Sequence, residues 1–201
     1  LMKVLAKEFP DIYFQSTGGT EVNALDDEMI ELMAKSNFYH AILAIESGDQ
    51  EVQAASVDKN VKLDRVPHVI KKLKEHKIEI KALFMIGFPG ETREEMQQTI
   101  DFALQCGADS FSFSILSPLP GTPIYRKVIK ENLWWEGRNM KDLMFRSSLV
   151  SVDGFKGPEE FEKFVNEANV KANLILKKND PSRFNFKYGK NANEKSLIKQ
   201  T

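Results

Sequence analysis

The 201-residue sequence has a single cysteine, Cys106, and three histidines. One cysteine excludes an internal disulfide and is typical of a reducing compartment, so we expect a cytoplasmic protein. It also excludes a zinc or iron–sulfur site built from a cysteine cluster within these residues. The histidines are too far apart in sequence to predict a metal site. With no histidine close to it, Cys106 is expected to be a small buried residue rather than a nucleophile.

The sequence also lacks an excess of charge of one sign and long apolar runs. The formal net charge is −1 at pH 7, which gives no electrostatic basis for binding nucleic acid. The apolar runs have the length of strands, so no membrane span is expected. Walker-type and dinucleotide-binding glycine patterns are absent. The chain begins at Leu1 within a helix-like segment, without a secretion leader, and we expect it to be part of a longer protein.

The most informative stretch that is present runs from Leu83 to Gln98. An apolar run, residues 82–86, predicts a buried strand, and the Gly-Phe-Pro-Gly sequence after it predicts a turn. Thr92 followed by Glu95 predicts a capping box that opens a helix, which should end at Gly107. In parallel α/β folds such a strand–turn–helix elbow often holds a ligand, although a plain connection would have the same pattern.

The same rhythm of strand and helix occurs four times. Expected strands cover residues 12–16, 40–46, 82–86 and 109–117, and expected helices cover residues 26–33, 50–56, 64–73 and 92–104. This alternation predicts an α/β fold with a parallel sheet of about four βα units, a partial TIM-like barrel, because four strands are too few to close one. Residues 1–132 would form this partial barrel. Residues 133–201 would form an irregular and helical extension, with a long helix beginning at Pro158 and a polar tail that is loose or docked by its aromatic side chains.

All four expected strands end in small or polar residues, which predicts a shared ligand rim. Glu46 stands out, because it ends an apolar run where a carboxylate is costly unless it is paired or bound. It could accept hydrogen bonds from ribose hydroxyls, or instead cap the next helix or pair with Lys59. Lys59 could itself offer a cation to a carboxylate or be merely solvated. On the last strand, Ser110, Ser112 and Ser114 share one face, which indicates either a polar lumen or an exposed sheet edge.

Three strings at the strand ends resemble the radical S-adenosylmethionine (SAM) superfamily. They are AIESGDQEV, LFMIGFPGETREEMQQTIDFA and SFSILSPLPGTPIY. The resemblance is strongest to the subgroup with an upstream cobalamin-binding domain, which includes anaerobic magnesium-protoporphyrin monomethyl ester cyclases. It implies the downstream part of a (β/α)6 barrel in a radical SAM oxidoreductase or transferase. The complete enzymes hold a [4Fe–4S] cluster on a CxxxCxxC loop, reductively cleave SAM to a 5′-deoxyadenosyl radical, and in this subgroup are associated with cobalamin.

The resemblance also implies roles for individual residues. Gln15 would lie near the methionine amino or carboxylate group of SAM, and Glu46 would face the ribose hydroxyls with Ser47 beside it. Lys59 would correspond to the basic residue after the fourth strand of the family. The adenine would be lined from the fifth and sixth barrel strands by Gly87, Phe88, Pro89, Leu116, Ser117 and Pro118.

The CxxxCxxC loop is absent from this chain. We therefore expect the C-terminal part of such an enzyme, inactive alone, whose main partner is the N-terminal part of its own barrel and whose small-molecule substrate the sequence does not identify. An alternative is a non-catalytic half-barrel that acts as a binding module and forms a homodimer through open sheet edges. A third possibility is a half-barrel that binds phosphate at the helix N-terminus of the elbow.

Overall fold

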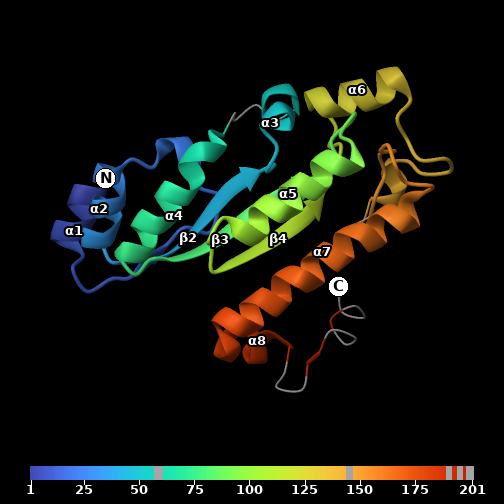
Figure 1. Ribbon diagram of the computed structural model, residues 1–201. Helices are drawn as coiled ribbons and strands as arrows, with labels where there is room; N and C mark the ends of the chain where they lie inside the picture. Colours follow the sequence, from blue (N-terminus) through green and yellow to red (C-terminus); the bar gives the residue numbers. More distant parts are fainter. Residues whose placement is uncertain (57–60, 144–146, 189–191, 194–196, 198–201) are drawn as a thin grey trace.

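The computed structural model describes residues 1–56, 61–143, 147–188, 192–193 and 197. A four-stranded parallel sheet in the order β1-β2-β3-β4 forms its centre (Figure 1). The strands are β1 (Phe14–Gln15), β2 (Phe38–Glu46), β3 (Glu79–Ile86) and β4 (Ser110–Ile115). Each strand lies beside the next in sequence, joined by a helical crossover. This is the expected α/β partial barrel, with each of the four strands at its expected place.

Helices α2, α4 and α5 lie over one face of the sheet, and α7 runs beside β4 (Figure 1). The helices are α1 (Met2–Glu8), α2 (Asp27–Lys35), α3 (Gln50–Ser56), α4 (Val66–Glu75), α5 (Arg93–Gln105), α6 (Pro123–Glu131), α7 (Pro158–Asn179) and α8 (Pro181–Tyr188). Within the part of the chain that the structure describes, every helix is too short or too polar to cross a membrane.

Side-chain caps explain where several of these helices begin. Asp26 accepts a hydrogen bond from the backbone N–H of Met29 at 2.7 Å, and Thr92 and Glu95 form the expected reciprocal capping box of α5. The sequence also predicts Asp64 as the cap of the helix expected over residues 64–73, and this prediction is wrong. Asp64 lies in a 3₁₀ turn (Leu63–Arg65), and α4 begins at Val66 with a proline in its first turn and no side-chain cap.

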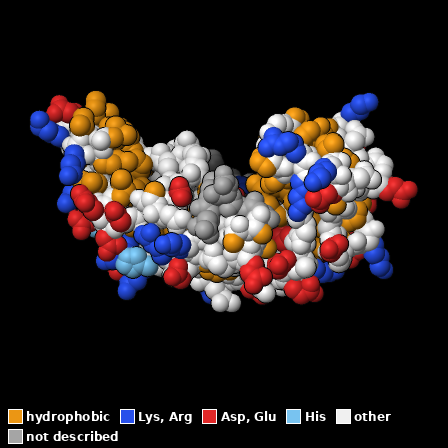
Figure 2. Space-filling model, turned by 90° about the horizontal axis from the view of Figure 1, so that it is seen from above, with side chains coloured by type: hydrophobic (Ala, Val, Ile, Leu, Met, Phe, Trp, Pro, Cys, Tyr) orange, Lys and Arg blue, Asp and Glu red, His pale blue; other side chains and the backbone are white. Residues whose placement is uncertain are grey.

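Alternation along β3 separates the two faces of the sheet. Ile80, Ala82, Phe84 and Ile86 are buried, and they belong to the main hydrophobic core with residues of α4 and α5. The intervening residues, Lys81, Leu83 and Met85, are only partly buried, and in the described part of the chain α2, α4 and α5 lie over the other side of the sheet (Figure 1). Seen from above, the molecule is a crescent with a hollow between its two arms (Figure 2). The curvature is that of an incomplete barrel, with helices outside and a concave face inside.

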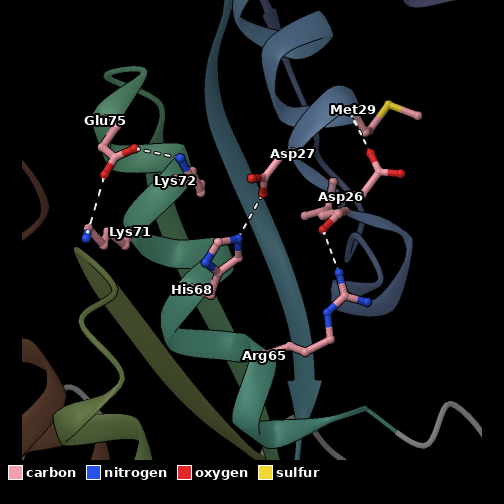
Figure 3. Close-up of polar contacts among 9 residues, drawn as sticks. Asp26, Asp27, Met29, Arg65, His68, Lys71, Lys72 and Glu75 are labelled. Carbon is pink, nitrogen blue, oxygen red and sulfur yellow. Dashed lines mark hydrogen bonds and ion pairs between the residues drawn. The ribbon is translucent and has the colours of Figure 1, made fainter.

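The helix-covered side carries an exposed polar network between α2 and α4 (Figure 3). His68 on α4 lies 2.8 Å from a carboxylate oxygen of Asp27 on α2, and this hydrogen bond lowers the pKa of Asp27. Lys72 pairs with Glu75 along α4 at 3.3 Å. More than half of the surface of the His68 and Asp27 side chains is exposed. Such pairs contribute little stability, so this network is a solvated surface rather than a site.

A single side chain on α7 occupies the edge of β4. Asn169 is buried, accepts a hydrogen bond from the N–H of Phe113 at 3.0 Å and donates one to the C=O of Phe113 at 3.0 Å. Its amide therefore imitates one residue of a neighbouring strand. The outer edge of β4, which was expected to be open for pairing with a second copy of the chain, is therefore covered at its centre by α7.

We expect Asn169→Ala to lower the free energy of unfolding by about 2–4 kcal/mol, because it leaves both backbone groups of Phe113 buried and unpaired. Urea denaturation measures this loss. Asn169→Asp is the comparison variant: it keeps the acceptor but replaces the donor with a buried negative charge that faces the C=O of Phe113, so its loss in neutral solution should be at least as large as that of the alanine variant. An alanine variant as stable as the wild type would show that water replaces the amide at this edge.

The tail beyond α7 docks through an aromatic side chain, one of the two expected outcomes. Phe184 on α8 is fully buried in a small cluster with Val170, Leu176, Ala192 and Leu197. Meanwhile α7 contributes Phe161 and Val165 to the main core, so the extension after residue 132 packs against the same core as the barrel. The boundary placed there from the sequence stays a prediction.

Candidate functional site

The carboxyl ends of β2, β3 and β4 meet through a small apolar cluster. Phe88 follows β3, Leu116 follows β4, and Val52 comes from α3, the helix after β2; all three are buried together. Because the strands are parallel, their following loops lie on one rim of the sheet. The structure thus brings together three of the four expected strand ends.

Glu46 ends β2 in an unusual backbone conformation. Its φ is +71°, in the left-handed region that non-glycine residues seldom adopt. The pairing with β3 shifts by one residue at the same point, so Ala44 pairs with Leu83 and Glu46 with Phe84. The side chain is half-buried. A bulge combined with a left-handed residue at a strand end redirects that side chain, and such strain clusters at functional positions.

The alternative role of Glu46 as the cap of α3 is wrong, because Asp49 has that role. A carboxylate oxygen of Asp49 accepts hydrogen bonds from the N–H groups of Glu51 and Val52 at 2.8 and 2.9 Å. The first turn of the helix is therefore satisfied without Glu46. The other alternative, a pair with Lys59, falls on a residue outside the described ranges, as does the expected role of Lys59 itself.

Ser47 holds the strand end against α5. It is fully buried, its hydroxyl lies 3.1 Å from that of Thr99, and it accepts the N–H of Asp49 at 3.1 Å. Thr99 also accepts the N–H of Gly48 at 3.0 Å, and a Cβ on Gly48 would lie 2.8 Å from the Cα of Thr99. The expected place of Ser47 beside Glu46 is thus observed, with its hydroxyl engaged by protein groups.

Gln53 is a site residue that the sequence reasoning missed. Its side chain is fully buried, and its amide nitrogen donates to the C=O groups of Ile45 and Ser47, the latter at 2.8 Å. These bonds clamp the residues on both sides of Glu46. The available signal was weak, because an amide three residues into a short helix usually faces solvent.

The elbow after β3 is built around Glu91, a second residue that was missed. One carboxylate oxygen of Glu91 accepts the N–H groups of Gly87 and Phe88 at 2.7 and 2.9 Å. The other oxygen is buried without a hydrogen-bond partner. Burial raises the pKa of Glu91 to about 7, against the opposing effect of the two backbone bonds. The Gly-Phe-Pro-Gly-Glu string is therefore a backbone loop closed by its own carboxylate.

The six residues expected to line adenine surround the elbow in two loops. Gly87, Phe88 and Pro89 are buried after β3, and Leu116 and Pro118 are buried after β4, whereas Ser117 is half-buried. The side chains of Phe88 and Leu116 pack on each other, so the two loops are held at a fixed separation. Contact with a flat ring at these positions would involve loop backbone and Ser117 more than large side chains.

The first strand contributes less to the rim. Gln15 on β1 is exposed, while the hydroxyl of Ser16 accepts the N–H of Ile42 at 2.8 Å. Gly19 lies so close to β2 that a Cβ would meet that of Ala44 at 2.5 Å. The segment therefore pairs with β2 at Gln15, after a register shift between Phe14 and Gln15, and pairs with it again at Thr20.

The outer side of the elbow disfavours phosphate binding. A cavity of about 330 Å³ lies there, between α3, the elbow and α6. It is lined by three carboxylates, from Glu51, Glu91 and Glu95, and by one cation, Lys127. In addition, the capping box of α5 engages the N–H groups of Thr92 and Glu95. A phosphate at this helix N-terminus would face the carboxylates of the cavity and would find part of the N–H groups already engaged.

The residues present do not fit an iron–sulfur cluster. Cys106 is buried, as expected, and its thiol lies 3.3 Å from the C=O of Ala103. Burial raises the pKa of this thiol, which disfavours the thiolate that a metal would need. Among the residues that the structure describes, no group of three or more histidine, cysteine or acidic side chains could hold a metal ion.

Comparison with known proteins identifies the family to which the chain is similar. The model of the radical SAM superfamily matches residues 4–103, about half of the chain. Cytidylyl-2-hydroxyethylphosphonate methyltransferase of Streptomyces wedmorensis is 31% identical over 157 residues, which are 75% of this chain and 29% of that protein.

Two structures of the radical SAM methyltransferase TsrM from Kitasatospora setae share the fold at 16% identity. One, with tryptophan and a SAM analogue bound, has a TM-score of 0.58 and coverage of 65% of this chain and 26% of TsrM. The other, with cobalamin and a [4Fe–4S] cluster, has a TM-score of 0.57 and coverage of 81% and 33%.

The chain thus spans about a third or less of the length of these relatives. The matched residues 4–103 contain β1, β2, β3 and most of α5, and therefore both Glu46 and the elbow. The match covers three of the four strand ends of the rim, and it agrees with the partial barrel seen in the structure. The chain belongs to the radical SAM superfamily.

Proposed function

We propose that this chain is the SAM-holding, downstream part of the barrel of a radical SAM methyltransferase. The observation that carries the proposal is the end of β2, where Glu46 combines a bulge in the strand pairing with a left-handed backbone conformation. Membership of the superfamily supports SAM as the ligand. The names of the relatives, which are methyltransferases, support methyl transfer as the reaction class.

Three parts of the rim would hold SAM. Glu46 would accept hydrogen bonds from the ribose hydroxyls, which suits a partly desolvated carboxylate. The exposed amide of Gln15 would contact the methionine end. The loops at residues 87–89 and 116–118 would flank the adenine, because the packing of Phe88 on Leu116 fixes their separation. When bound, SAM would supply the group that reacts, and these residues would bind and orient it.

We expect this chain to bind S-adenosylhomocysteine, a stable probe of the same site, and Glu46→Gln to weaken that binding at least tenfold. The variant loses the charge that strengthens both ribose hydrogen bonds. Isothermal titration calorimetry measures the affinity. Glu51→Gln, which removes a nearby exposed carboxylate on α3, is the control and should bind as the wild type does. Equal effects of the two variants, or no binding by the wild type, would contradict the proposal.

The chain alone is expected to produce no radical, because its one cysteine cannot hold a [4Fe–4S] cluster. After anaerobic reconstitution with iron, sulfide and a reductant, SAM should remain intact and no 5′-deoxyadenosine should form. Chromatography of the reaction mixture measures both. Formation of 5′-deoxyadenosine above the protein-free control would refute this expectation. The cluster, and cobalamin as in TsrM, would be contributed by the N-terminal part of the same enzyme.

A second candidate function, a non-catalytic interaction module, is favoured by one observation. Several large hydrophobic side chains are exposed near the N-terminal edge of the sheet, and Figure 2 shows hydrophobic groups gathered on that arm. They are Leu1, Val4, Phe9, Ile12, Tyr13 and Tyr39, exposed by 45–87%. This surface suits either the upstream half of the barrel or a second copy of the chain. Sedimentation equilibrium distinguishes them: a stable dimer that binds no S-adenosylhomocysteine would favour the module.

A further inference from the structure

The concave face holds a basic cavity whose lining residues, apart from Ser117, are not among those proposed to bind SAM. It has a volume of about 380 Å³ and is lined by Lys81, Ser112, Phe113, Ser114, Ile115, Ser117 and Lys187. Lys81 comes from β3, the serines come from β4 and the loop after it, and Lys187 comes from α8. Two ammonium groups and three hydroxyls therefore surround one space, and none of the described residues that line it is acidic.

The polar groups of β4 in this cavity have their hydrogen-bonding capacity available. Within the described ranges, the hydroxyls of Ser112, Ser114 and Ser117 make no hydrogen bond to another protein group. The hydroxyl of Ser110, next to Lys81 in the strand pairing, is buried without a hydrogen-bond partner. The wall of a packed barrel is normally apolar, so a row of serine hydroxyls on the concave face, half-buried at Ser112 and exposed at Ser114, suits a polar ligand that enters from solvent.

Lys81 is placed where a cation is costly. It is half-buried, and in the described part of the chain no carboxylate lies within ion-pair distance of its ammonium group. Its pKa is lowered, first by burial and then by the charge of Lys187. A bound anion would offset both effects, because it would replace lost water and screen the two like charges from each other.

We propose that this cavity binds the phosphate or phosphonate group of a small-molecule substrate, between the ammonium groups of Lys81 and Lys187 and the hydroxyls of Ser112, Ser114 and Ser117. These donors come from β3, from β4 and from α8, and therefore from several directions. Such an arrangement suits a tetrahedral group with three oxygens better than a flat carboxylate. Ser117 belongs both to this cavity and to the loop expected to line adenine. A substrate held here by its anion would therefore extend toward the rim; this assignment as a substrate subsite rests on the proposed function.

The test uses the complete 201-residue chain, with methylphosphonate as the probe and acetate as its flat counterpart, titrated at constant ionic strength. Amide chemical shifts in the NMR spectrum measure binding. Methylphosphonate should bind saturably and shift the amides of Ser112 and Ser114, and Lys81→Met should weaken it at least tenfold. Lys71→Met removes an exposed lysine on α4 that pairs only with Glu75 and should have no effect. Ser112→Ala with Ser114→Ala should weaken binding several-fold.

Three results would overturn the proposal: no saturable binding, equal losses in the two lysine variants, or tighter binding of acetate than of methylphosphonate. Binding of S-adenosylhomocysteine is measured on the same samples and should be unchanged in Lys81→Met. Nucleoside binding without phosphonate binding would overturn the cavity assignment and leave the proposed function standing. Phosphonate binding without nucleoside binding would establish the anion site and refute the proposed function.

Discussion

Gly87→Ala is expected to lower the free energy of unfolding by about 3 kcal/mol. Two costs combine. The φ of Gly87 is +95°, which an L-residue adopts only with strain of roughly 1–2 kcal/mol. A Cβ there would also lie 2.8 Å from Cζ of Phe161, a fully buried ring of α7, and overpacking a core costs about 1–3 kcal/mol. Urea denaturation followed by circular dichroism measures the loss.

Gly90 supplies the matched control three residues later. Its φ is +93°, nearly the same, but a Cβ there would meet no atom within 4 Å. Gly90→Ala should therefore show the backbone cost alone, about 1 kcal/mol. The difference between the two variants isolates the contact between the elbow and α7. Equal losses would mean that Phe161 moves aside freely, and that α7 does not fix the elbow.

Local signals were sufficient to predict most of the fold. A continuous apolar run such as residues 40–46 is typical of a parallel strand, and Thr92 with Glu95 marked the start of α5 correctly. Both signals depend on neighbours in sequence. The prediction at Asp64 was wrong, because Asp64 lies inside a 3₁₀ turn and the helix begins two residues later without a side-chain cap.

The contacts that shape the site depend on residues far apart in sequence. Thr99 reaches back 52 residues to Ser47, and Asn169 reaches back 56 residues to Phe113. In the sequence, each is one polar residue on a helix, where solvent exposure is the ordinary expectation. The resemblance to a family named the loops of the rim, but it did not identify the clamps Gln53 and Glu91 that hold those loops. Those clamps become visible only when burial and hydrogen bonds are known.

The wild type is expected to lose about 3 kcal/mol of stability relative to Glu91→Gln as the pH rises from 4.5 to above 7. The pKa of Glu91 is raised from 4.5 to about 7 in the folded state, chiefly by burial. Between these values the folded protein binds the proton more tightly than the unfolded chain does, so stability is full below pH 4.5 and falls as the pH rises through 7. At about 1.4 kcal/mol per pH unit, the raised pKa corresponds to about 3 kcal/mol. Urea denaturation from pH 4 to 8 measures both proteins.

Glutamine is the informative replacement because its carbonyl oxygen can still accept the N–H groups of Gly87 and Phe88, while it cannot ionise. Any constant offset between the proteins reports the changed packing, and only the slope reports the proton. Glu51→Gln, at an exposed carboxylate, should keep the wild-type slope. Parallel curves for wild type and Glu91→Gln would show that the two backbone bonds outweigh burial. In the expected case, the amides of Gly87 and Phe88 shift in the NMR spectrum with a midpoint near pH 7, because the charge that develops on Glu91 lies within hydrogen-bond distance of both.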